Sequence, residues 1–127
     1  QSTEALQDIC NSISKINPKI KIVLTVSPIR HIADGAIENS LSKSTLLLSI
    51  DEIKKSYPDI DYFPSYEILI DELRDYRFYA TDMNHPSCVA IEYIYERFAE
   101  TYFSSQTINV AKTKEKEWKH QHHKQLL

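Results

Sequence analysis

The sequence predicts an α/β fold, a partial three-layer sandwich in which a short parallel sheet is flanked by helices. Helical patterns and short apolar runs alternate along the 127 residues, which is the element order of a parallel sheet with helical crossovers. Both apolar runs are continuous, so we expect both faces of the sheet to be covered. Two strands are too few to hide four helices, and we interpret the chain as about half of a doubly wound domain.

The first helix is expected over residues 3–16, where Leu6 and Ile9 begin a series of apolar side chains three or four positions apart. An Asn-Pro pair ends this helix. The β-branched run at residues 20–26 then predicts a strand of the buried parallel kind. A Ser-Pro pair ends the strand, and the loop that follows contains the only glycine of the chain, Gly35.

A long helix is expected from this loop to the Tyr-Pro pair at residue 57. Its predicted buried side comprises Ile37, Leu41, Ser44, Leu48 and Ile53. A second short strand is predicted at residues 60–63, a short helix at 66–73 and an irregular segment at 74–84.

The last strong helix is expected to begin at His85 and Pro86, because proline is tolerated in a first turn. Its predicted buried side comprises Cys88, Ile91, Tyr95, Phe98 and Tyr102. We expect one domain over residues 1–111, followed by a charged helical or disordered tail over residues 112–127.

Charge is unevenly distributed along the chain. From residue 112 onward five lysines and two glutamates give +3, which leaves −6 for the rest of a chain whose net charge is −3. An acidic body gives no reason to expect a nucleic acid partner, and the short tail offers few phosphate contacts. The tail histidines stand among lysines without a cysteine or acidic partner, so we expect a solvated helix face there and no metal site.

Composition excludes several function classes. A single glycine rules out the glycine-rich loops that bind nucleotides and the GxSxG turn of many serine hydrolases. Cys10 and Cys88 show neither CxxC spacing nor the density of a disulfide scaffold, which favours a reducing compartment. No apolar segment is long enough to span a membrane and no export signal is visible, so the cytoplasm is the default expectation.

Two loops follow the predicted strands, at the edge where open α/β sheets bind ligands. The first is residues 25–31, and the second contains Asp82 and His85. Their spacing of three lets the carboxylate accept a hydrogen bond from Nδ1 of the imidazole and leaves Nε2 free to act as a base. A helix-capping aspartate beside a surface histidine gives the same spacing, and spacing alone leaves both interpretations open.

Four segments resemble the C-terminal part of the GSCFA family, bacterial proteins placed in the SGNH hydrolase superfamily. They read TVSPIRHIADG (25–35), ENSLSKSTLL (38–47), YFPSYEILIDELRDYRFYATDMNHPS (62–87) and AIEYIYERF (90–98). They follow in the family's order over nearly all of residues 21–103. The resemblance implies the C-terminal half of an SGNH-like, flavodoxin-like fold.

The resemblance also implies ester hydrolysis or acyl transfer, with His85 as the base and Asp82 as its orienting acid. The family's serine nucleophile and oxyanion groups come from earlier blocks, and the Gly-Ser-Cys-Phe-Ala segment that names the family is not in this chain. We therefore expect the nucleophile to lie outside the chain, and the chain alone to be inactive. Ser65 and Ser87 more simply cap the helices that follow them. No cofactor is expected.

His31, Arg30 and Ser27 are the expected substrate-binding residues, because they follow the first strand and belong to an SP-x-R-H motif that the family shares. A hydrogen-bonded loop histidine is the alternative for His31, and an ion pair with Asp34 or Glu38 is the alternative for Arg30. The superfamily implies an acylated small molecule or carbohydrate as substrate. The rival hypothesis is a non-catalytic module that forms a homodimer or domain swap through an exposed sheet edge.

Overall fold

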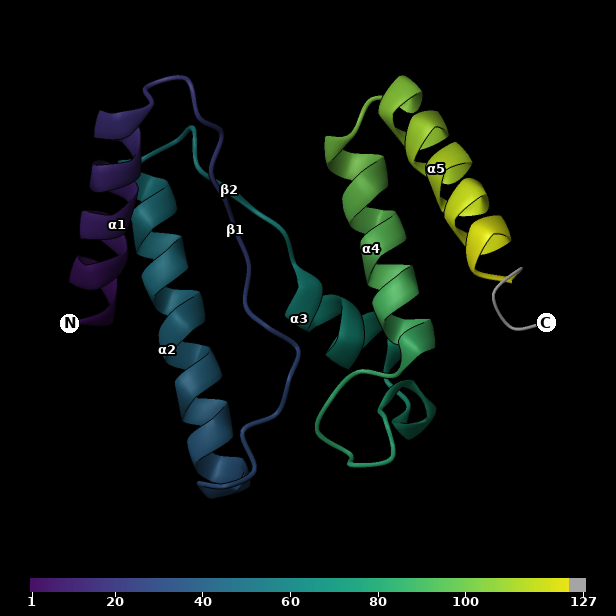
Figure 1. Ribbon diagram of the computed structural model, residues 1–127. Helices are drawn as coiled ribbons and strands as arrows, with labels where there is room; N and C mark the ends of the chain where they lie inside the picture. Colours follow the sequence, from purple (N-terminus) through teal and green to yellow (C-terminus); the bar gives the residue numbers. More distant parts are fainter. Residues whose placement is uncertain (124–127) are drawn as a thin grey trace. The chain divides into compact units, whose positions relative to one another are not determined.

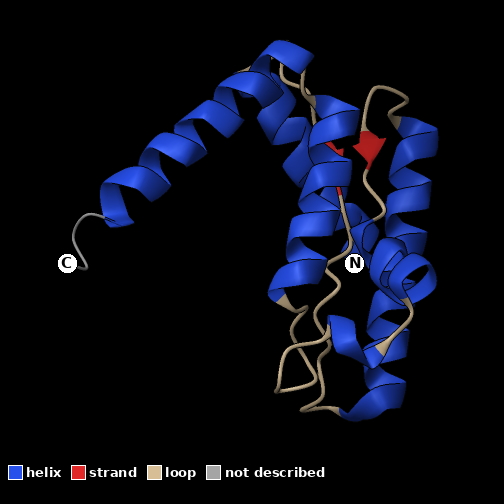
Figure 2. Cartoon of the chain, turned by 90° about the vertical axis from the view of Figure 1, so that its right-hand side faces the viewer, coloured by secondary structure: helices blue, strands red, loops and turns tan. Residues whose placement is uncertain are grey.

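The computed structural model describes residues 1–123 and is rich in helix, with one short parallel sheet (Figure 2). It divides into two compact units, Gln1–Ile91 and a second unit that begins at Glu92. The observed class is α/β, as the alternation of elements predicts.

Two long helices pack side by side in the first unit, α1 (Ser2–Ile16) and α2 (Gly35–Ser56) (Figure 1). Burial of apolar side chains holds them, since Cys10 from α1 and Ile53 from α2 form a core with Ile60. Leu6, Ile22, Leu24 and Tyr57 pack around this core and are partly buried. Both predicted ends of α1 and the predicted C-terminal end of α2 agree with the structure to within two residues.

The sheet consists of β1 (Val23–Leu24) and β2 (Asp61–Tyr62), which pair in parallel with Val23 opposite Asp61. The strands are shorter than the predicted runs at 20–26 and 60–63, and Val23 and Leu24 are only partly buried. The hydrogen-bonded ladder of the sheet ends because side-chain hydroxyl groups donate to the backbone carbonyls that follow the two strands. The Thr25 hydroxyl donates to the Phe63 carbonyl over 2.7 Å, and the Ser65 hydroxyl donates to the Val26 carbonyl over 2.8 Å.

The prediction for the buried side of α2 is wrong for all but one of its apolar members. Ile37 is 76% exposed and Leu48 is 70% exposed, and Leu41 is exposed as well. The side that faces the rest of the unit buries Lys43, Ser49, Ile50 and Ile53 instead. Apolar residues lie all around this helix, so sequence periodicity did not distinguish its two sides.

A compact set of short helical segments follows β2: α3 (Ser65–Glu67), η1 (Ile68–Leu73) and η2 (Tyr76–Phe78). η1 is a π-helix, and it ends where Arg74 adopts the left-handed conformation with φ 51°. Ser65 is the first residue of α3 and not its side-chain cap, because its hydroxyl is used by the end of β1.

Helix α4 (Cys88–Tyr102) begins three residues later than predicted. Pro86 precedes the helix and pairs with Tyr79 in an antiparallel bridge. The Ser87 hydroxyl accepts the Ala90 N–H over 3.3 Å, which is the capping role expected for this serine. The predicted buried side is also displaced, since Cys88, Ile91 and Tyr95 are exposed while Ala90 and Ala99 are buried.

The second unit contains most of α4 and α5 (Ser105–His123). Residues 112–123 of the predicted tail belong to α5. The remaining residues of the predicted tail, 124–127, lie outside the described part of the chain. Within residues 1–123, none of the helices combines the length and the apolar character needed to cross a membrane.

Candidate active site

Asp82 and His85 lie in a tight turn between η2 and α4. Asp82 Oδ2 is 2.6 Å from His85 Nδ1, and Asp82 Oδ1 accepts the backbone N–H groups of Asn84 (2.9 Å) and His85 (3.0 Å). Met83 adopts a left-handed conformation with φ 60° between them. The turn is closed by the Ala80 N–H, which donates to the His85 carbonyl over 2.7 Å.

These contacts fix the charge state of the Asp82 carboxylate. The two backbone N–H groups and the imidazole lower the pKa of Asp82 to about 2, because all three donate to its ionised form. An ionised Asp82 favours the imidazole tautomer that carries its proton on Nδ1. Among the described residues none hydrogen-bonds to His85 Nε2, which is therefore available as a base.

The loop after β1 meets this turn through Arg30. The Arg30 N–H donates to the Asn84 carbonyl over 3.0 Å, and a guanidinium N–H donates to the Met83 carbonyl over 3.4 Å. The two loops that follow the predicted strands are thus joined by hydrogen bonds. Asn84 Oδ1 is buried here without a hydrogen-bond partner among residues 1–123.

The Arg30 side chain stacks on aromatic rings. Its guanidinium carbon lies 4.0 Å from the centre of the Tyr79 ring and 5.6 Å from that of Tyr76. Within the described part of the chain no salt bridge joins Arg30 to Asp34 or Glu38, so the ion-pair alternative is wrong. Cation–π stacking holds the guanidinium in place without neutralising its charge.

The other two predicted binding residues lie in the same loop, and both have exposed side chains. Ser27 Oγ accepts the Ile29 N–H over 3.3 Å, which is a local turn contact. The His31 backbone N–H donates to Asn39 Oδ1 over 2.9 Å and fixes the end of the loop against α2.

Sequence reasoning missed Lys43, which lies in the middle of α2 and is only 3% exposed. Its ammonium donates to the Ser27 carbonyl over 2.5 Å and lies 5.7 Å from the centre of the Tyr66 ring. Burial lowers its pKa, because removal from water disfavours the charged form. Lys43 and Arg30 both line a pocket of about 400 Å³ between α2, the loop after β1 and the π-helical segment.

Among the described residues none of the three candidate serines hydrogen-bonds to His85, and each hydroxyl has another contact. The Ser65 hydroxyl contacts Thr25 Oγ1 over 2.6 Å and the Val26 carbonyl over 2.8 Å, and Ser65 is buried. Ser87 caps α4 and Ser27 caps its own turn.

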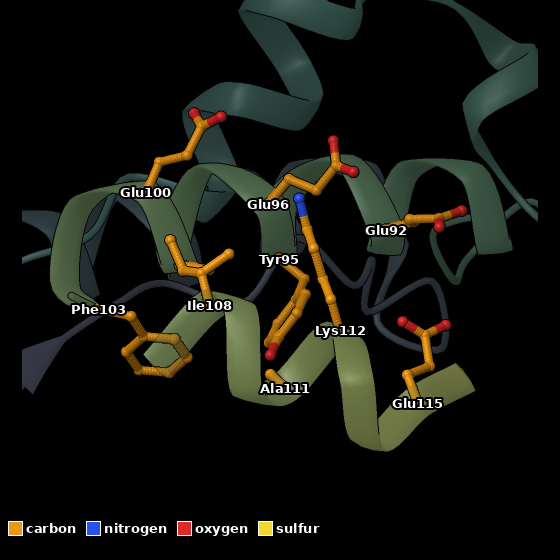
Figure 3. Close-up of a pocket in the computed structure, with 10 residues that line it drawn as sticks. Glu92, Tyr95, Glu96, Glu100, Phe103, Ile108, Ala111, Lys112 and Glu115 are labelled. Carbon is orange, nitrogen blue, oxygen red and sulfur yellow. The ribbon is translucent and has the colours of Figure 1, made fainter. Parts of the chain in front are cut away.

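The second unit has a separate pocket of about 400 Å³ between α4 and α5 (Figure 3). Tyr95, Phe103 and Ile108 form its apolar wall, and Lys112 extends toward Glu96 at its edge. In α5 the Trp118 and His122 rings stack with centres 4.1 Å apart. Among the described side chains no group of three or more histidines, cysteines or acids could hold a metal ion.

A model of the GSCFA family matches residues 1–98, which is about three quarters of the chain. The chain belongs to the GSCFA family. The match includes α1, which lies before the segments that carry the resemblance, and it ends within α4. No curated protein and no solved structure matched this GSCFA chain. The family is hydrolase-like, and the turn of Asp82 and His85 lies inside the matched region.

Proposed function

We propose that this GSCFA chain supplies the general base of an SGNH-type ester hydrolase or acyltransferase. The observation that carries the proposal is the contact of 2.6 Å between Asp82 Oδ2 and His85 Nδ1, with Nε2 free of partners among the described residues. This is the arrangement that activates a serine hydroxyl in catalytic triads. In this proposal the chain forms the C-terminal part of a three-layer SGNH-like domain.

His85 Nε2 accepts the serine proton as the serine oxygen bonds to the acyl carbon, and returns that proton to the leaving alcohol as the ester C–O bond breaks. A water molecule then attacks the acyl carbon of the acyl-enzyme while His85 Nε2 accepts a proton from that water. The bond between the acyl carbon and the serine oxygen breaks, and His85 returns the proton to the serine oxygen. Asp82 stays ionised throughout and stabilises the imidazolium.

The serine and the oxyanion donors come from residues outside this chain. Support for this comes from the other contacts of Ser27, Ser65 and Ser87. The unpaired Asn84 Oδ1 also supports it, because a buried acceptor without a donor is costly and a docked segment or substrate would supply one. In this proposal the substrate is an acylated small molecule or carbohydrate. It contacts three residues of the adjoining loop, Ser27, Arg30 and His31.

Ester hydrolysis by the complete gene product tests the proposal. The His85→Ala variant is expected to lower kcat/KM for a p-nitrophenyl ester roughly 10²- to 10⁴-fold, because proton transfer then falls to water. His120→Ala, an exposed histidine of α5, is the matched control and should keep full activity. Undiminished turnover in the His85 variant would contradict the assignment of the base.

A second candidate function is self-association, and the exposed apolar side of α2 favours it. Ile37, Leu41 and Leu48 project from this side at helical spacing, and β1 and β2 each pair on one side only within residues 1–123. Exposed apolar faces and open strand edges mark interaction sites. Sedimentation should then show a dimer that Leu48→Glu dissociates, and a wild-type chain that sediments as a monomer would exclude this candidate.

A further inference from the structure

The pocket between α2 and the loop after β1 has an unusual charge. Two cationic side chains line it, Lys43 and Arg30, and among the described residues its lining contains no aspartate or glutamate. The chain as a whole carries net charge −3. A pocket that concentrates positive charge in an acidic protein is a site where an anion is favoured.

Lys43 is the more informative of the two cations. Burying an ammonium is costly unless a partner compensates it, and within residues 1–123 Lys43 has no carboxylate within salt-bridge distance. The Ser27 carbonyl takes one of its three donors. The remaining donors and the uncompensated charge suit an anionic group that enters the pocket.

Arg30 adds a second, oriented donor group to the lining of the pocket. Stacking on Tyr79 at 4.0 Å holds its planar guanidinium, and among the described residues its side chain forms one hydrogen bond, at 3.4 Å to the Met83 carbonyl. A guanidinium has five N–H donors in a fork that matches carboxylate and phosphate oxygens. Arg30 is thus fixed in position with most of its donors available.

The rest of the wall is mixed, since Asn39 and Ser40 are polar and the other side chains are apolar or aromatic. Ile32, Ile70 and Tyr66 line the pocket together with the two cations. Its volume of about 400 Å³ lies in the range of small-molecule sites. The apolar and aromatic part of this wall favours an anion that also carries an apolar body.

We propose that this pocket binds an organic anion, a carboxylate or a phosphate monoester, through Lys43 and Arg30. The Arg30 backbone joins the pocket to the turn that carries Asp82 and His85. We therefore assign the anion to the substrate of the proposed hydrolase. Only this last assignment rests on the proposed function, because anion binding itself needs no turnover.

Titration of the isotope-labelled chain with benzoate, phenyl phosphate and neutral benzamide, followed by NMR, tests the proposal. Both anions should give saturable shifts of the Arg30 and Ser40 amide signals, and benzamide should bind at least about tenfold more weakly because it lacks the charge. Comparison of the two anions distinguishes a carboxylate site from a phosphate site. Benzamide binding as tightly as both anions would overturn the proposal.

Variants of α2 and the loop separate binding from structure. Lys43→Met should weaken anion binding roughly tenfold or more and Lys43→Arg should retain it, since a charge-assisted contact is lost only in the first. Lys55→Met, an exposed lysine of the same helix paired with Asp51, is the matched control. Arg30→Gln should weaken binding in the same direction and provides the test if the Lys43 variant does not fold. Unchanged anion affinity in the folded variants would overturn the proposal.

The binding and turnover experiments can fail independently. Anion binding that depends on Lys43, combined with ester hydrolysis that does not depend on His85, would keep the pocket and remove the proposed hydrolase. Hydrolysis that depends on His85, with no selective anion binding, would keep the proposed hydrolase and remove the proposed anion site.

Discussion

The two halves of the inward side of α2 bury side chains of opposite chemistry. Near its C-terminus Ile53 is 1% exposed and packs with Cys10 and Ile60 in the apolar core. In its N-terminal half Lys43 is 3% exposed and lines the cationic pocket. The apolar half recovers free energy by leaving water, and the charged half does not. In our proposal, burial of Lys43 serves binding and not stability.

The largest expected effect is in the apolar half. Ile53→Ala should lower the free energy of unfolding by about 2–5 kcal/mol, because it removes buried methyl groups and leaves a cavity in the core. Urea denaturation followed by circular dichroism measures this loss.

Ile37→Ala is the matched control on the opposite side of the same helix. Ile37 is exposed, so this change should alter stability by less than about 0.5 kcal/mol. A loss at Ile37 comparable to that at Ile53 would mean that a second copy covers the exposed side in solution.

The charged half should respond in the opposite direction. Lys43→Met removes a desolvated charge, so the variant is expected to be no less stable than the wild type at pH 7. The pKa of Lys43 is lowered in the folded chain. At pH values between this lowered pKa and 10.5, the unfolded chain therefore binds more protons than the folded chain. Wild-type stability should therefore rise relative to the variant as the pH increases toward 10.5.

Unfolding curves from pH 7 to pH 10.5 measure this difference. A large loss of stability in Lys43→Met at pH 7 would show that Lys43 is structural and would remove the contrast between the two halves of α2.

The smallest expected effect concerns the exposed turn of Asp82. Its pKa of about 2 lies below the usual 3.8, so its contribution to stability is complete above about pH 4 and is lost as the pH falls toward 2. Carboxyl carbon NMR should give a titration midpoint near 2 for Asp82. A midpoint near 3.8 would show that the backbone and imidazole contacts do not persist in solution.

The class of the fold and the pair in the turn were accessible from the sequence, because both depend on local order and spacing. Helix ends follow from prolines and glycine, and Asp82 and His85 are only three residues apart. Strand length was not accessible, since the sheet ends through contacts of Thr25 and Ser65, which are 40 residues apart. Such contacts leave no periodic signal.

The orientation of α2 was the most consequential error. Apolar residues occur on both of its sides, and the inward stripe has the same spacing of three and four as the exposed one. The inward stripe comprises the buried Lys43, Ile50 and Ile53 and the partly buried Asn39, Leu47 and Tyr57. A lysine in that stripe was the available signal for the pocket. Choosing the stripe requires knowledge of β1 and α1, which pack against it only in the folded chain.

The central claim is that Asp82 holds His85 with Nε2 free to act as a base, and the tautomer of the His85 ring tests it most directly. Long-range hydrogen–nitrogen NMR on the neutral imidazole distinguishes a proton on Nδ1 from one on Nε2. The structure predicts a protonated Nδ1 and an unprotonated Nε2, with this preference lost in Asp82→Ala. A proton on Nε2 in the wild-type chain would contradict the claim.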